Sequence, residues 1–155
     1  MRFLNFAGEA LIKSFESCRL MAYKDLGGVW TIGWGHVGAE VHQGMVITQD
    51  QADDQFSNDV SFFERGVDMI VESRISDNQF AALVSFAYNV GLDIDDDAKA
   101  EGLGDSTLLK KVNAGDLAGA ALEFPKWNHV KGKVVAGLTR RRLAEQKLFN
   151  TKDDK

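Results

Sequence analysis

Residues 19–37 read RLMAYKDLGGVWTIGWGHV, and this stretch decides the fold class. Aromatic and β-branched residues stand on both sides of Asp25, Gly27 and Gly28, a pattern that predicts a small hairpin with a glycine-rich turn. Upstream, the hydrophobic pattern changes to helical spacing. The apolar residues that recur there at steps of three and four are Leu4, Ala7, Leu11 and Phe15. This spacing predicts an amphipathic helix that ends near Glu16.

The chain that follows the hairpin is predicted to be mostly helical. Thr48 with Gln51, and Ser76 with Gln79, each form a capping-box signature in front of apolar residues at helical spacing. The second of these helices is the more apolar, so we expect it at the centre of the core. Three further helices are predicted, over residues 106–114, over residues 116–124 and from Thr139 onward.

Composition restricts the class of protein. With 155 residues, 45% of them hydrophobic and 26% charged, the chain resembles an ordinary globular domain that can bury a core without disulfides or metals. Its one cysteine, Cys18, cannot form an internal disulfide. The net charge of -5 disfavours a nucleic-acid binder. One helix, a small antiparallel sheet and then a series of helices predict a single α+β domain over residues 1–155.

Two carboxyl groups are the candidates for chemistry. Glu16 follows Phe15 at the predicted helix end, where the helix dipole is negative, whereas Asp25 lies in a solvated glycine turn. Two carboxyl groups in contrasting environments are what glycoside hydrolysis requires, one to protonate the leaving oxygen and one to assist water or the sugar cation. Thr31 adds a hydroxyl on the returning strand. Spacing alone favours the alternative interpretation, that these acids are surface charges.

A wider resemblance changes this balance. Glu16, Asp25 and Thr31, followed by IGWGH at residues 32–36, resemble the catalytic signature of the phage-type lysozymes, the endolysin family of glycoside hydrolases. Four later segments resemble family segments in the family order: SFAYNVG (85–91), STLLKKVNAGD (106–116), EFPKWNHVKGKVVAGL (123–138) and TRRRLAEQKLF (139–149). The resemblance therefore covers nearly the whole chain.

The resemblance implies a lysozyme-like α+β fold. A small antiparallel β-hairpin lobe would span about residues 19–47. A larger helical lobe would span about residues 48–150 and include the N-terminal helix, with the substrate groove between the lobes. The resemblance also assigns roles: Glu16 would be the general acid, Asp25 the carboxylate that places water or stabilises positive charge, and Thr31 the group that orients the water.

Three supporting or substrate-binding residues are also implied by the resemblance. Arg142 matches a basic position that approaches the active-site acid, with its neighbours Arg140 and Arg141 as alternatives. Trp34 stands where family members commonly have tyrosine, so it keeps a flat ring and loses a hydroxyl. His36 either pairs with Asp59 or packs within the hairpin, and neither interpretation makes it a catalyst.

The implied activity is hydrolysis of the β-1,4 bond between N-acetylmuramic acid and N-acetylglucosamine in bacterial peptidoglycan, without a metal or cofactor, for host cell lysis. Direct attack by water with inversion and intramolecular attack that yields an anhydro sugar both remain open. Glu9 and Lys13 interrupt any secretory signal, and no uncharged run reaches the roughly 18 residues of a membrane span. We therefore expect a monomer that accumulates in the host cytoplasm and reaches the cell wall and periplasm through a holin.

One alternative belongs to a different functional class. Residues 126–147 carry seven basic side chains against the single acid Glu145, although the whole chain is acidic. Such a patch is also consistent with a non-catalytic, cationic wall-binding or membrane-perturbing module on a lysozyme-like fold.

Two apparent ligand motifs fail on their context. Gly33, Gly35 and Gly38 satisfy a dinucleotide-binding pattern, but no helix is predicted directly after them. Asp93, Asp95 and Asp97 imitate the start of an EF-hand loop, which then has Ala98 in place of glycine and Gly104 in place of glutamate. We instead interpret the acidic stretch 93–105 as a solvated insertion that reshapes one lip of the groove. The histidines show no metal spacing.

Overall fold

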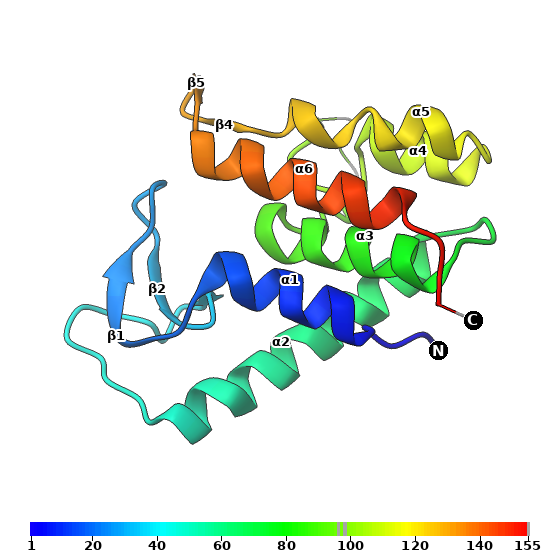
Figure 1. Ribbon diagram of the computed structural model, residues 1–155. Helices are drawn as coiled ribbons and strands as arrows, with labels where there is room; N and C mark the ends of the chain where they lie inside the picture. Colours follow the sequence, from blue (N-terminus) through cyan, green and yellow to red (C-terminus); the bar gives the residue numbers. More distant parts are fainter. Residues whose placement is uncertain (96, 98, 155) are drawn as a thin grey trace.

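The computed structural model describes residues 1–95, 97 and 99–154, and it combines a small β-sheet with a larger group of helices (Figure 1). The helices are α1 (Phe6–Glu16), α2 (Gln49–Ile70), α3 (Asp77–Val90), α4 (Thr107–Asn113), α5 (Leu117–Ala121), the 3₁₀ turn η1 (Phe124–Lys126) and α6 (Ala136–Asn150). The strands are β1 (Arg19–Lys24), β2 (Trp30–Gly33), β3 (His36–Val37), β4 (His129–Val130) and β5 (Lys133–Val134). This is the predicted α+β class.

Helix α1 ends at Glu16, as the sequence predicts. It begins because the Asn5 side chain accepts a hydrogen bond from the Gly8 amide at 2.9 Å, which satisfies one of the free amides of the first turn. It ends because Ser17 adopts a positive φ of 44° and leaves the helical path. Glu16 is therefore the last helical residue, directly before the sheet.

The predicted hairpin is present and carries a third strand. β1, β2 and β3 are antiparallel in that order, with Lys24 opposite Trp30 at the end of the hairpin. The turn is shaped by Asp25, whose Oδ1 accepts the Val29 amide at 2.8 Å. Gly28 supplies the positive φ of 84° that this turn needs and that other residues rarely adopt. The hydrogen bond from the Val29 amide also fixes the position of the Asp25 carboxyl group.

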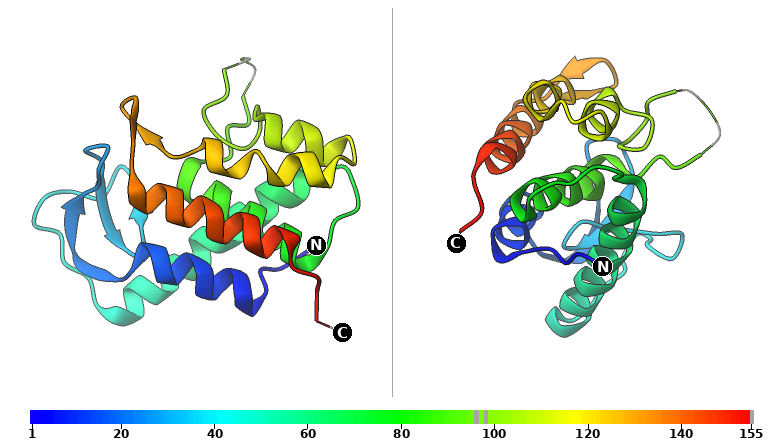
Figure 2. Two further views of the ribbon diagram at one scale, coloured as in Figure 1. Left: turned by 45° about the horizontal axis from the view of Figure 1, so that its top comes forward. Right: turned by 90° about the vertical axis from the view of Figure 1, so that its right-hand side faces the viewer.

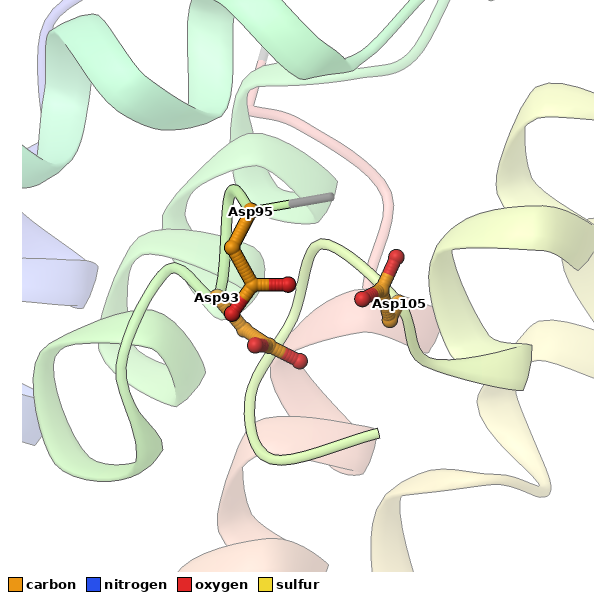
Figure 3. Close-up of side chains that lie close together, drawn as sticks. All are labelled: Asp93, Asp95 and Asp105. Carbon is orange, nitrogen blue, oxygen red and sulfur yellow. The ribbon is translucent and has the colours of Figure 1, made fainter. Parts of the chain in front are cut away.

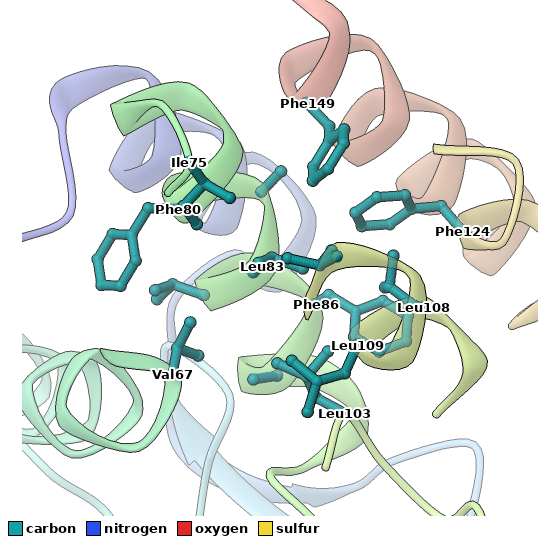
Figure 4. Close-up of a cluster of buried hydrophobic side chains, with 14 of the residues drawn as sticks. Val67, Ile75, Phe80, Leu83, Phe86, Leu103, Leu108, Leu109, Phe124 and Phe149 are labelled. Atoms are coloured by element: carbon teal, nitrogen blue, oxygen red, sulfur yellow. The ribbon is translucent and has the colours of Figure 1, made fainter. Parts of the chain in front are cut away.

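Helix α3 forms the centre of the helical group, as its apolar sequence predicts. Both predicted capping boxes, at Thr48 and Ser76, are present. The right-hand view of Figure 2 looks nearly along α3, with α1 and α2 on one side of it and α4, α5 and α6 on the other. The apolar side chains that fill the space around α3 include Val67, Leu83, Phe86, Leu103, Leu108, Phe124 and Phe149 (Figure 4). Burial of each large apolar side chain contributes about 1.5 to 3 kcal/mol.

Two predicted helix boundaries in the C-terminal third need correction, and one hairpin was missed. The predicted helix over 116–124 ends earlier, because its last residues form η1 around Pro125. The last helix begins at Ala136 and not at Thr139, since its N-cap, Val135, provides no capping side chain for the sequence to reveal. The β4–β5 hairpin was not predicted. Its strands are two residues long, and only the positive φ angles of Lys131 and Gly132 mark its tight turn.

Among the described residues, no helix combines the length and the apolar character needed to cross a bilayer.

Candidate active site

Glu16 is held by a buried arginine. Arg141, on α6, donates a hydrogen bond from Nη1 to Glu16 Oε1. The Arg141 side chain is 4% exposed and that of Glu16 is 16% exposed, so the pair is largely shielded from water. The carboxyl group therefore has a fixed direction and one partly open side, which suits a group that must meet a substrate.

The structure corrects which arginine contacts Glu16, although Arg142 does line a hollow together with Asp25. Arg142 is fully buried, donates from Nη2 to Glu145 Oε1 at 2.6 Å and lies over the Phe86 ring. Arg141, one of the two alternatives, makes the contact with Glu16. Consecutive residues of a helix point about 100° apart, so only one of these arginines can face α1. The sequence alone does not give the rotation of α6 about its axis.

Gly35 lies directly against the Glu16 carboxyl group. A Cβ atom added at Gly35 would collide with Glu16 Oε2 and Cδ, and Gly35 also has a φ of 81°. Two properties of this position therefore require glycine: its backbone conformation and the close approach of the Glu16 carboxyl group. The turn between β2 and β3 thus packs against one side of the Glu16 carboxyl group.

Glu16 and Asp25 line two neighbouring hollows. The first, of about 420 Å³, contains Asp25, and the second, of about 400 Å³, contains Glu16. Both hollows are also lined by Leu26, Asn89 and Leu138, so they form adjoining parts of one groove. The groove runs between the β1–β2 turn on one side and α6 with the β4–β5 hairpin on the other. The structure thus brings both predicted carboxyl groups to one depression.

Tyr23 gives a second indication that the two carboxyl groups are neighbours. Burial raises the pKa of the Tyr23 phenol, and the negative charges of Glu16 and Asp25 raise it further, while Arg19 opposes them. Tyr23 pairs across the sheet with Thr31. Thr31 is 3% exposed, and its hydroxyl donates to the Val29 carbonyl at 3.0 Å. The hydroxyl therefore has a fixed position in the sheet close to Tyr23.

Trp34 lies between α1 and α2. Its indole nitrogen donates to Asp53 Oδ1 at 2.9 Å, its ring packs against Phe56, and the Lys13 ammonium group lies 5.2 Å from the ring centroid. Within the described part of the chain, Trp34 does not line either of the two hollows that contain Glu16 and Asp25. The indole therefore joins the sheet to the helices, and its N–H group has a protein partner.

His36 is held by two carboxylates. Its Nδ1 lies 2.7 Å from Asp59 Oδ2 on α2, which is the predicted pair, and its Nε2 lies 2.6 Å from Glu40 Oε1. Partial burial by itself would lower the pKa of His36, but the hydrogen bonds to Glu40 and Asp59 outweigh burial and raise the pKa above 6.5. The imidazolium therefore connects β3, α2 and the loop before α2.

Replacing His36 by Asn is expected to lower the free energy of unfolding by about 1 kcal/mol near pH 5.5. The value is reduced because solvent around Glu40 screens the attraction between this carboxylate and the imidazolium. Below the unfolded pKa of 6.5 the imidazole is charged in both states, so the contribution is complete. It is lost as the pH rises through the raised pKa of the folded state. Urea unfolding should therefore show a smaller difference in the free energy of unfolding between wild type and His36→Asn at about pH 8.5 than at about pH 5.5.

The matched control for this experiment is His129→Asn. His129 is exposed, and no ion pair of this residue occurs in the described part of the chain. Its stability difference from wild type should be small at both pH values. A difference for His36→Asn that stays constant with pH would contradict the imidazolium assignment.

The acidic stretch brings three carboxylates together, in a different set from the three aspartates that imitate an EF-hand loop. Oxygen atoms of Asp93, Asp95 and Asp105 lie within 4.8 Å of one another (Figure 3). Burial raises the pKa of Asp105, and the neighbouring aspartates raise it further. Asp93 Oδ2 also accepts the amides of Glu101 and Gly102, so it closes the loop on itself. Ala98, the position where the EF-hand pattern fails, lies outside the described residues.

Comparisons with known proteins agree with this architecture. The muramidase domain of SpmX from Asticaccaulis excentricus superposes with a TM-score of 0.80 at 35% identity, covering 97% of this chain and 99% of that one. An endolysin from Escherichia coli O157:H7 phage FAHEc1 also gives a TM-score of 0.80 at 35% identity, covering 99% and 98% of the two chains.

Among curated relatives, the endolysin of Bacillus phage PZA is 47% identical over 147 residues, or 94% of this chain and 54% of that protein. The endolysin of Bacillus phage B103 is 46% identical over 96% of this chain and 54% of its own length. The chain thus spans about half the length of these two relatives. The family model described as phage lysozyme matches residues 13–145, a range that contains the whole groove, and on this match the chain belongs to the phage lysozyme family.

Proposed function

We propose that this chain is the catalytic domain of an endolysin that cleaves the β-1,4 bond between N-acetylmuramic acid and N-acetylglucosamine in bacterial peptidoglycan. The observation that carries the proposal is the groove itself, in which Glu16 and Asp25 line adjoining hollows. Most glycoside hydrolases use two carboxyl groups at a sugar-binding groove, one to protonate the leaving oxygen and one to assist water or the sugar cation. The names of the related phage endolysins and of the SpmX muramidase domain support the same substrate.

In this proposal, Glu16 is the general acid. Its carboxyl group donates a proton to the bridging oxygen as the bond to the anomeric carbon breaks. Arg141 and Gly35 limit the directions that the carboxyl group can take, so the proton is delivered from a defined position. Asp25, on the turn between β1 and β2, stabilises the positive charge of the sugar, orients the attacking water and accepts the proton that this water loses as it adds to the anomeric carbon. Thr31 takes the proposed role of holding that water.

The remaining parts of the proposal concern the cell. The enzyme acts as a monomer without a metal or cofactor, as an N-acetylmuramidase. It accumulates in the host cytoplasm and reaches the wall and periplasm after a holin opens the membrane. Size-exclusion chromatography with light scattering tests the monomer, and lysis of cells that express the chain with and without a holin tests the route.

Analysis of digested peptidoglycan tests the activity. We expect new reducing ends and muropeptides whose masses include one added water per bond cleaved. Muropeptides lighter by one water would instead identify intramolecular attack with an anhydro product. A binding module without catalysis would release no muropeptides of either mass, and that result would overturn the proposal.

A further inference from the structure

A second buried carboxylate lies behind Arg141. Glu145 is 0% exposed, and its Oε1 accepts hydrogen bonds from Arg141 Nε at 3.2 Å and from Arg142 Nη2 at 2.6 Å. The Ser85 hydroxyl lies 3.4 Å from the same oxygen. Glu145 follows the two arginines by four and three positions on α6, so all three residues share the face that packs against α3. This carboxylate does not touch the groove.

Each of the three nitrogen atoms of the Arg141 guanidinium group has a hydrogen-bond partner. Nε donates to Glu145 and Nη2 donates to the Ser85 carbonyl at 3.2 Å, which leaves Nη1 for Glu16. The guanidinium is planar and its donors form a rigid fork, so two fixed partners at the back determine where the third donor points. A long side chain without those partners would have several rotamers available.

We propose that Glu145 is a positioning residue for bond cleavage: it fixes the Arg141 guanidinium, and Arg141 in turn fixes the Glu16 carboxyl group. This inference rests on the proposed role of Glu16 as the proton donor. It adds a residue in the interface between α3 and α6, away from the groove, to the groups that control bond cleavage. The Ser85 carbonyl supplies the backbone part of the same support.

A purely structural role for Glu145 makes a different prediction. Arg142 is a fully buried cation, and Glu145 is its carboxylate partner, so removing Glu145 costs stability whether or not it affects catalysis. If neutralising Arg142 were its only task, a folded variant would keep the catalytic constant of the wild type. The experiment must therefore separate activity per folded molecule from stability.

The first variant is Glu145→Gln, which keeps the size of the side chain and removes its charge. Below its unfolding temperature, we expect kcat to fall about tenfold and KM to change by less than about twofold. The split between kcat and KM is expected because the groove that binds the sugar chain is unchanged, whereas the Glu16 carboxyl group loses its fixed direction.

A double-mutant cycle tests whether Glu145 acts through Arg141. In the background of Arg141→Met, the additional change Glu145→Gln should alter kcat by less than about twofold, because its target is already absent. Independent, multiplicative losses in the double variant would overturn the proposal. Leu108→Ala provides the matched stability control, since Leu108 is fully buried among apolar residues of the same helical group. It should lower the unfolding temperature while the folded protein keeps the wild-type kcat.

A further variant keeps the proposal testable if Glu145→Gln does not fold. Glu145→Asp retains the charge for Arg142 but shortens the reach to Arg141, and we expect a lower kcat with a smaller loss of stability. A folded Glu145→Gln or Glu145→Asp with wild-type kcat would overturn the inference. If Glu16→Gln also retained wall hydrolysis, the proposed function itself would fail, so the two failures are distinguishable.

Discussion

Glu16→Gln is expected to reduce peptidoglycan hydrolysis by about 10³-fold, the largest effect of any single substitution in the chain. Glutamine has nearly the same size and can still accept a hydrogen bond from Arg141, so the geometry of the pocket is kept. It cannot donate an acidic proton to the bridging oxygen. The rate of reducing-end formation measures the loss, and circular dichroism and thermal unfolding show that the variant is folded.

Glu9→Gln is the matched control for this loss. Glu9 lies on the same helix as Glu16, is exposed, and pairs with the half-buried Lys13 at 2.9 Å. The two substitutions remove the same chemical group from α1, one inside the groove and one outside it. Glu9→Gln should hydrolyse the wall at the wild-type rate. If Glu16→Gln kept more than about a tenth of that rate, Glu16 would not be the general acid.

Gly35→Ala is expected to produce the second largest effect, a loss of about 100-fold in kcat. The new methyl group would overlap the Glu16 carboxyl group, which would have to leave its contact with Arg141 or rotate away from the groove. A misplacement of about 1 Å at a reacting group is sufficient for a loss of this size. Alanine at a positive φ also costs about 1 to 2 kcal/mol of stability.

Gly115→Ala separates the two causes. Gly115 has a φ of 78°, close to that of Gly35, but a Cβ atom there meets nothing within 4 Å. Both variants should therefore lose a similar amount of stability in thermal unfolding. Only Gly35→Ala should lose activity per folded molecule. Equal kcat values for the two variants would show that the contact between Gly35 and Glu16 has no effect on catalysis.

Features with local causes were predictable from the sequence. The capping boxes at Thr48 and Ser76 depend on side chains three residues apart, and the hairpin depends on glycines inside one short run. Asp25 belongs to the same category, because the turn that positions it is built from its own carboxyl group and Val29. For these features, the residues that determine the structure lie within a few positions of one another.

Features that depend on the packing of distant elements were not predictable. The choice of Arg141 over Arg142 is set by how α6 is rotated against α1 and α3, and three adjacent arginines give no indication of that rotation. The support from Glu145 follows from the same rotation. The contact of Gly35 with Glu16 joins a turn to a helix end, and a glycine in a sequence does not reveal which neighbour excludes its side chain.

The contact between Glu16 and Arg141 has a consequence for when the enzyme becomes competent. These two residues are 125 positions apart, and Glu145 lies further along the chain. During synthesis, the opening helix and the sheet emerge long before the segment that supplies the guanidinium. A ribosome-bound chain therefore exposes Glu16, the proposed proton donor, without the group that orients it. Cleavage activity should arise only when translation of α6 is finished and that helix has docked, so incomplete polypeptides remain harmless to the wall.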